Sequence, residues 1–307
     1  MQLQEFTVAS TSGQRDLHVC QWTPDGAPRA VVQLTHGMCE HILRYAPLAG
    51  ALTERGFAVI GHDHLGHGLT ALDENDLGVF PADHPAQTMA DDIRKITTLA
   101  KARFPGLPVF LLGHSMGSFL ARRVCMEAPQ TYRGVILMAT GEVPAPVIQS
   151  AKGALRTMIR LRGANHRPVR VTQLGIARNN RQFQPIETDN DWLSSDREKL
   201  AVYNADPLCR FTFTAAGYLM LMKTLEYIQK PEHVRALSPE LSILFVSGAL
   251  DPIGENGRGV QRLFRRYQKE CPDTQMKLYP GCRHQILDET ISDTICADIA
   301  DWVEARI

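Results

Sequence analysis

Short apolar runs alternate with amphipathic segments along most of the chain. Six runs have the length and residue types of buried strands: 30–35, 57–60, 108–113, 134–139, 241–246 and 275–279. Segments between them, such as 89–99, carry apolar residues every three or four positions, as amphipathic helices do. Two further strands are expected at 3–10 and 16–22. Since strands that alternate with helices form parallel sheets, the pattern predicts an α/β fold with a mostly parallel central sheet and helices on both faces. The final helix is expected to bury one face, formed by Ile291, Ile295, Ile299 and Trp302.

The alternation stops after Thr140. Residues 142–238 contain helix-like segments and polar breaks but no clear apolar strand, and the strand pattern resumes at Leu241. The simplest organisation is therefore one sheet domain, residues 1–141 and 239–307, interrupted by a mainly helical insertion at 142–238.

Composition narrows the class of protein. The 307 residues include 33 Lys+Arg and 33 Asp+Glu, so no basic surplus points to a nucleic-acid partner. The seven cysteines form no C-x-x-C pair, which favours reduced thiols in the cytoplasm. The N-terminus lacks the basic and apolar regions of a secretory signal, and no apolar run approaches the roughly 20 residues that span a bilayer.

The clearest chemical motif is Gly113-His114-Ser115-Met116-Gly117. It follows an expected strand and precedes an expected helix at 118–128, which is the context of a nucleophile elbow. In such an elbow the serine lies on a strained turn, so neighbouring positions must lack Cβ atoms. Ser115 is thus the candidate nucleophile.

A nucleophilic serine needs a base and an acid that orients the base. Because functional side chains of a parallel sheet gather at the carboxyl ends of its strands, the acid and the base are expected directly after strand ends. Asp251 follows the strand 241–246, and His284 follows the strand 275–279. The order Ser115, Asp251, His284 is that of α/β-hydrolases. Glu142, at the end of the preceding strand, is the competing acid.

Two backbone N–H groups are expected to hold the oxyanion of the reaction. One belongs to Met116, the residue after the nucleophile, and the other to Met38, in the loop after the strand 30–35.

Together these motifs resemble the monoglyceride lipase and lysophospholipase group of α/β-hydrolases, the serine aminopeptidase S33-like hydrolases. The matching motifs, in chain order, are H-G-x-x-E-H-x-x-R-Y at 36–45, G-H-D-H-x-G-H-G at 61–68, G-H-S-M-G at 113–117, G-x-x-D-P at 248–252 and R-H at 283–284. The resemblance implies that the insertion is a cap domain. It also implies that Asp63, His64 and His67 hold loops, so a metal site at His62, His64 and His67 is not favoured, and no cofactor is expected.

The chain departs from this group at two positions. Cys39 stands where monoglyceride lipases usually have glycine, and Leu287 stands where members that hold glycerol have a second histidine. Glu40 and Arg44 remain candidate contacts for the alcohol part of a substrate, with an ion pair that braces the loop as the alternative.

The sequence therefore predicts a serine hydrolase that cleaves carboxylic esters of single acyl chains, such as a monoacylglycerol or lysophospholipid. Transient contact with a membrane surface through the cap is also expected. An aminopeptidase or thioesterase with the same triad, and a non-catalytic binding protein on the same fold, are the alternatives. An aminopeptidase would need an acidic recess, for which the insertion offers Glu187, Asp189, Asp191, Asp196 and Glu198. An acyl pocket would draw on the apolar cluster Phe211, Phe213, Tyr218, Leu219, Met220, Leu221 and Met222.

Overall fold

The strands and helices alternate as the sequence predicts. The computed structural model describes residues 1–81 and 84–307, and within them eight strands form one sheet in the order β1-β2-β4-β3-β5-β6-β7-β8. The strands β1 and β2 pair antiparallel, β2 pairs antiparallel with β4, and all remaining neighbours are parallel. The strand bounds are β1 Gln2–Ala9, β2 Asp16–Thr23, β3 Ala30–Thr35, β4 Phe57–His62, β5 Val109–His114, β6 Gly134–Met138, β7 Ser242–Gly248 and β8 Thr274–Tyr279.

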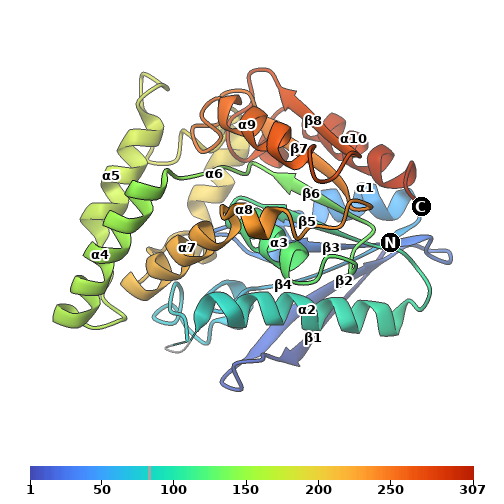
Figure 1. Cartoon of the computed structure of the whole chain (residues 1–307), viewed down its shortest axis with the longest axis horizontal. Coiled ribbons are helices and arrows are strands. Elements are labelled where there is room, and N and C mark those ends of the chain that lie inside the picture. Colours follow the sequence, from blue (N-terminus) through green and yellow to red (C-terminus); the bar gives the residue numbers. More distant parts are fainter. Residues whose placement is uncertain (82–83) are drawn as a thin grey trace.

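Helices cover both faces of this sheet (Figure 1). The helices α1 and α10 pack together over one face, whereas α2, α3 and α9 contribute to the buried cluster on the other face. The predicted α/β fold with a mostly parallel sheet is confirmed. The helix bounds are α1 Ala46–Glu54, α2 Pro85–Arg103, α3 Met116–Glu127, α4 Ala145–Arg162, α5 Val169–Asn180, α6 Arg197–Ala205, α7 Ala215–Ile228, α8 Pro231–Val234, α9 Arg258–Tyr267 and α10 Ser292–Glu304.

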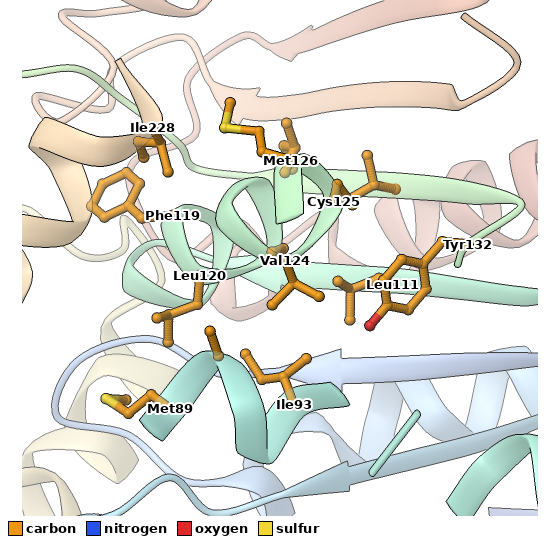
Figure 2. Packing of buried hydrophobic residues seen from close by; sticks show 14 of the residues in the cluster. Met89, Ile93, Leu111, Phe119, Leu120, Val124, Cys125, Met126, Tyr132 and Ile228 are labelled. Atoms are coloured by element: carbon orange, nitrogen blue, oxygen red, sulfur yellow. The ribbon is translucent and has the colours of Figure 1, made fainter. Parts of the chain in front are cut away.

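The helix α3 packs against β5 in the centre of the sheet (Figure 2). Its residues Leu120 and Val124 are fully buried beside Leu111 of β5 and Ile93 of α2. Each such side chain contributes roughly 1.5–3 kcal/mol when it is removed from water. The strand and helix on either side of Ser115 are thus held rigidly.

Two helix ends differ from the prediction. The helix α3 begins at Met116, two residues earlier than expected, directly after the serine. The helix α10 begins at Ser292, so Ile291 precedes its first turn and is 39% exposed, while Ile295 and Ile299 are buried. The expected buried face is therefore shorter by one residue, because a residue outside the helix does not follow its 3.6-residue period.

The segment 142–238, which is described throughout, contains the helices α4 to α8 and no strand. The helix α7 packs against α2 and α3, and α4 packs against α7. In Figure 1, α4 and α5 lie at the end of the molecule opposite the chain termini. None of the described helices is long and apolar enough to cross a membrane.

Candidate active site

Ser115 lies in a strained turn between β5 and α3. Its φ angle is +50°, a value that residues with a Cβ atom rarely adopt. A Cβ atom on Gly113 would lie 2.4 Å from the Gly117 carbonyl oxygen, and one on Gly117 would lie 2.0 Å from the Thr35 carbonyl oxygen. Both flanking positions therefore require glycine, which explains the spacing in the motif.

The structure brings the three predicted triad residues together. The Ser115 Oγ lies 2.9 Å from the His284 Nε2, and the His284 Nδ1 lies 3.0 Å from the Asp251 Oδ1. His284 comes from the loop after β8, and Asp251 comes from the loop after β7. These separations are hydrogen-bond distances, so the hydroxyl, imidazole and carboxylate form one continuous chain.

Asp251 is held in place by its own loop. Its Oδ1 accepts a hydrogen bond from the Ile253 N–H at 2.8 Å, and its Oδ2 accepts one from the Ser247 hydroxyl at 3.3 Å. The side chain is fully buried. The competing acid, Glu142, forms an ion pair with Arg266 instead.

The two predicted oxyanion donors are unengaged. Within the described residues, neither the Met38 N–H nor the Met116 N–H donates to a protein acceptor. Met116 is the first residue of α3, where backbone N–H groups have no partner in the helix and the dipole favours negative charge. Met38 lines the same cavity as Ser115, and Met116 follows Ser115 directly in the chain.

Glu40 connects the loop of Met38 to the elbow. One carboxylate oxygen accepts hydrogen bonds from the Gly37 N–H, from the Tyr45 hydroxyl at 3.0 Å and from the His114 Nδ1 at 2.7 Å. The second ring nitrogen of His114 lies 3.4 Å from the carbonyl oxygen of His284. Burial lowers the pKa of His114, the Glu40 carboxylate raises it, and the balance lies above the ordinary value. The pKa of Glu40 is correspondingly held well below its usual range, although burial alone would raise it.

Arg44 forms an ion pair with Asp288, and its guanidinium lies 4.8 Å from the centre of the Tyr203 ring. Glu40 and Arg44 line a small separate cavity with room for about one water molecule (about 20 Å³). These contacts support the loop-bracing alternative for the pair rather than contact with a substrate.

Cys39 adopts a φ angle of +56°, a conformation that glycine adopts without strain. Its carbonyl oxygen accepts a hydrogen bond from the Tyr203 hydroxyl at 2.9 Å, and its thiol donates to the Phe211 carbonyl at 3.2 Å. Burial raises the thiol pKa to about 12, so the group is a neutral thiol at physiological pH. Cys39 therefore ties the loop of Met38 to two parts of the segment 142–238.

His62, the last residue of β4, and His64 and His67, in the loop after it, are buried. The His64 N–H donates to the His36 Nε2 at 2.9 Å, and the His67 Nδ1 donates to the Leu65 carbonyl at 3.0 Å. Burial lowers the pKa of His62 and His67 to about 3 and that of His64 well below its ordinary value. Asp63 accepts hydrogen bonds from the Ile42 and Leu69 N–H groups, at 2.7 and 2.9 Å.

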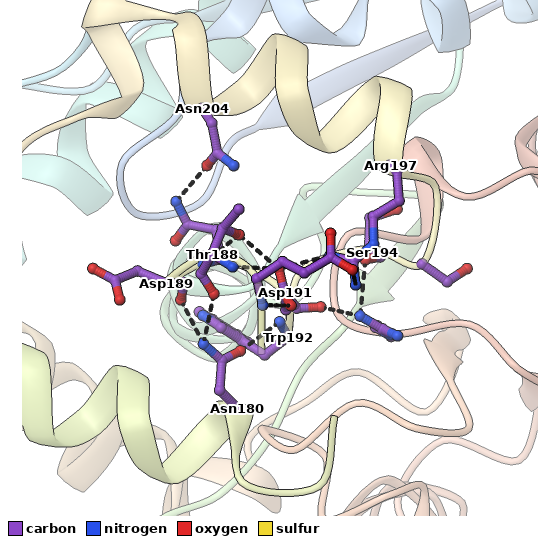
Figure 3. Close-up of polar contacts among 12 residues, drawn as sticks. Asn180, Thr188, Asp189, Asp191, Trp192, Ser194, Arg197 and Asn204 are labelled. Atoms are coloured by element: carbon purple, nitrogen blue, oxygen red, sulfur yellow. Dashed lines mark hydrogen bonds and ion pairs between the residues drawn. The ribbon is translucent and has the colours of Figure 1, made fainter. Parts of the chain in front are cut away.

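Sequence reasoning missed Trp192, which lies against the base. The Trp192 and His284 ring centres are 4.8 Å apart, and the His284 N–H points at the Trp192 carbonyl at 3.4 Å. Trp192 follows a turn built around Asp191 (Figure 3). The fully buried Asp191 carboxylate accepts hydrogen bonds from the Glu187 N–H at 2.9 Å and from both donors of Thr188, and it pairs with Arg197 at 2.8 Å. The local sequence T-D-N-D-W at 188–192 gives no hint of this packing.

A cavity of about 750 Å³ opens above Ser115 and His284. Much of its wall is apolar, and α5 contributes Val169 and Ile176. Of the expected apolar cluster, only Phe211 and Tyr218 line this cavity. Phe213 and Met220 instead pack in the main buried cluster, because α7 lies on α2 and α3. The volume is within the range of pockets that enclose small organic ligands.

Comparison with known proteins matches this geometry. A sequence model of the serine aminopeptidase S33 family matches residues 26–291. The chain belongs to this family. Solved structures that match nearly the whole chain share its architecture, and the fold is that of the α/β-hydrolases. Among S33 relatives, human monoglyceride lipase is 28% identical over 293 residues, which cover 93% of this chain and 86% of the human protein. The monoacylglycerol lipase of Mycolicibacterium smegmatis is 28% identical over 310 residues, covering 99% and 98% of the two chains. The crystal structure of a thermostable carboxyl esterase from Bacillus coagulans, in complex with glycerol, superimposes with a TM-score of 0.93 at 28% identity, covering 100% of this chain and 99% of the esterase.

Proposed function

We propose that the protein is a serine hydrolase that cleaves carboxylic esters of single acyl chains. The observation that carries this proposal is the hydrogen-bonded chain of Ser115, His284 and Asp251, which lies at a cavity lined by apolar and polar residues together. The S33 relatives that cover nearly the whole chain include monoacylglycerol lipases, and a similar solved structure is a carboxyl esterase.

In the first half-reaction, the Ser115 Oγ attacks the acyl carbonyl while the His284 Nε2 accepts the hydroxyl proton. Asp251 keeps the other ring nitrogen protonated and stabilises the imidazolium. The N–H groups of Met38 and Met116 hold the oxyanion of the tetrahedral intermediate. The alcohol leaves with the proton from His284, and an acyl-enzyme remains.

In the second half-reaction, His284 removes a proton from water, which attacks the acyl carbon. The intermediate collapses, the carboxylic acid leaves and Ser115 regains its proton. Neither half-reaction requires a metal or a cofactor.

The segment 142–238 serves as the cap in this proposal. It covers the cavity with residues from α5, from the 186–196 turn and from the 206–214 loop. We propose a monoacylglycerol, lysophospholipid or similar ester as the substrate and transient contact of the cap with a lipid surface.

An aminopeptidase remains the second candidate because the family is described by that activity. The cap acids give it little support. Asp191 accepts hydrogen bonds within its own turn and pairs with Arg197, and Asp196 caps α6 by accepting the Glu198 and Lys199 N–H groups. Glu74 and Asp189 line the cavity, but Arg167 and Arg210 line it too, so its acids are matched by basic residues.

The test is a panel of p-nitrophenyl esters of increasing chain length beside aminoacyl anilides. We expect ester cleavage and negligible anilide cleavage, with at least about a 10⁴-fold loss of kcat in Ser115→Ala. Asp251→Asn should lower kcat strongly, whereas Glu142→Gln, the matched control, should leave it nearly unchanged. A preference for anilides would favour the aminopeptidase, and fluorophosphonate labelling that persists in Ser115→Ala would exclude this serine as the nucleophile.

A further inference from the structure

His41 belongs to the motif at 36–45 but lies outside the catalytic triad. Its Nε2 lies 2.8 Å from the Oδ2 of Asp206, a residue far away in the sequence. The sulfur of Cys209 completes a group in which an imidazole nitrogen, a carboxylate oxygen and a thiol sulfur all lie within 4.8 Å of one another. These are the atoms with which proteins bind Zn²⁺, so the group is a candidate metal site.

Asp206 and Cys209 lie on one short turn that holds both side chains in place. The Cys209 N–H donates to the Asp206 carbonyl at 3.1 Å. In a 3₁₀ turn of this kind, side chains three residues apart lie on the same side. The Asp206 Oδ1 accepts the Leu208 N–H at 2.9 Å, while the Oδ2 contacts His41. The turn thus presents two of the three ligands before a metal binds.

The burial and charge of the group also suit Zn²⁺. Cys209 is a buried free cysteine, and the side chains of His41 and Asp206 are 11% and 22% exposed. A thiolate and a carboxylate together balance the two charges of Zn²⁺, so a bound ion adds no net charge to this partly buried place. Arg44, which lies near both anionic ligands, is itself paired with Asp288.

The group joins two parts of the chain beside the active site. His41 lies three residues after Met38, the predicted oxyanion donor of the sheet domain. Cys209 belongs to the segment 142–238 and lines the cavity above Ser115. A metal ion held by all three ligands would therefore connect this segment to the loop of Met38.

We propose that His41, Asp206 and Cys209 bind Zn²⁺ and that the ion fastens the segment 142–238 to the sheet domain. One imidazole nitrogen, one carboxylate oxygen and the thiolate sulfur are the protein ligands, and water takes the fourth position. On binding, the thiol proton passes to the solvent, because the thiolate is the form that coordinates the metal. The ion takes no part in ester cleavage, so this site does not rest on the proposed function.

The experiment uses the full chain, freed of metal with a chelator, and Co²⁺ as a coloured substitute for Zn²⁺. We expect each chain to take up about one Co²⁺, with the near-ultraviolet charge-transfer absorption of a thiolate ligand, and Zn²⁺ to displace it. Cys209→Ser should abolish this absorption. His41→Gln and Asp206→Asn should each lower the Zn²⁺ affinity, measured by competition with a chromophoric chelator, by more than about tenfold, since even the loss of a group that only orients a ligand costs about 10- to 100-fold.

A second group of similar residue types supplies the matched control. Glu5, His18 and Cys20 also have ligand atoms within 4.8 Å of one another, on the strands β1 and β2. A metal bound there would give the same thiolate absorption. Cys20→Ser should therefore keep both the absorption and the Zn²⁺ affinity of the unaltered protein.

Hydrogen exchange tests whether the ion fastens the two parts of the chain together. Zn²⁺ should slow the exchange of backbone N–H groups in both 37–45 and 206–211, and it should have no such effect in Cys209→Ser. Circular dichroism establishes that each variant is folded. Cleavage of p-nitrophenyl butyrate by the metal-free protein tests the proposed function separately.

Three outcomes would overturn the metal site. They are absence of binding, binding without thiolate absorption, and thiolate absorption that persists in Cys209→Ser but disappears in Cys20→Ser. Slower exchange confined to one of the two loops would show that the ion does not fasten the segment 142–238 to the sheet domain.

Discussion

At the scale of single residues, Glu40 connects several parts of the active site although it is not a member of the triad. Its one carboxylate oxygen holds the loop of Met38 through Gly37 and the elbow through His114. His114 in turn contacts the backbone carbonyl of His284. The oxyanion loop, the nucleophile and the base therefore share one buried ionic centre.

We expect Glu40→Gln to lower kcat by about 10- to 100-fold with little change in KM, because misplacing an oxyanion donor affects the transition state more than the bound substrate. The amide keeps the size of the side chain but no longer carries the charge that pairs with His114. Steady-state kinetics on p-nitrophenyl butyrate measure the effect.

Tyr45→Phe is the matched control, since it removes one hydrogen bond to the same oxygen but leaves the charge pair of Glu40 with His114 in place, and it should change kcat by less than about threefold. A Glu40→Gln protein that is less stable but keeps its kcat per folded molecule would show that the residue is merely structural.

The triad could be predicted from the sequence because its members follow strand ends, and strand ends of a parallel sheet meet at one edge. The elbow glycines also have a local steric reason. Trp192 could not be predicted in the same way, since its contact with His284 depends on the path of a polar segment across the sheet edge. The roles of Glu40 and Arg44 likewise depended on partners, His114 and Asp288, that lie far away in the chain.

At the scale of elements, the turn before α6 positions one side of the active site. The Asp191 carboxylate accepts hydrogen bonds from the backbone of this turn and forms an ion pair with Arg197. The following residues meet the catalytic loop directly, since the Gln285 N–H donates to the Leu193 carbonyl at 2.7 Å and Arg283 donates to the Ser194 carbonyl at 3.1 Å.

Asp191→Asn should lower kcat by about tenfold, equivalent to about 1.4 kcal/mol in the barrier. The amide nitrogen cannot accept the backbone N–H groups, so the turn and Trp192 would shift away from His284. Glu187→Gln is the control, because that side chain is 63% exposed and pairs only with Arg197. Unchanged kcat in a folded Asp191→Asn protein would contradict this role of the turn.

Most strands and helices agree with their sequence patterns, because apolar runs and helical periods report burial directly. The helix α10 deviates at Ile291, where an apolar residue at the right spacing precedes the first turn. The sequence also could not show which residues of the 211–222 cluster pack in the core and which line the cavity. The reason is that α7 has apolar residues on the faces toward both.

At the scale of the whole molecule, His18 joins the sheet edge to the loops above it. Its ring nitrogens contact Asp63 and Glu5, each at 2.9 Å, and its side chain is 10% exposed. The hydrogen bond to Asp63, together with those to Cys20 and Glu5, raises its pKa to about 10. Between pH 6.5 and 10 the folded protein thus holds a proton that the unfolded chain releases.

This linkage fixes the sign of a pH effect. The contribution of His18 to stability is complete below about pH 6.5 and is lost as the pH rises through 10. We expect His18→Gln to lower the free energy of unfolding by about 2 kcal/mol at pH 6 and by much less at pH 10. Urea unfolding at both pH values measures this difference, with the exposed His84→Gln as the control. An equal loss at the two pH values would show that the imidazole is neutral in the folded protein.

The amino-acid composition does not show how charged residues are distributed along the chain. The equal totals of acidic and basic residues average over an arginine-rich α4–α5 pair and acidic segments elsewhere. A balanced total therefore does not reveal the stretch 143–186, which has eight Lys and Arg and no Asp or Glu.

Cys39 is hydrogen-bonded to Tyr203 and to the backbone of Phe211. The position of the Met38 loop therefore depends on the position of the segment 142–238. A compound that bound between the cap and the sheet would displace this loop and move the Met38 N–H away from the oxyanion. Such a compound would stop turnover without reacting with the serine.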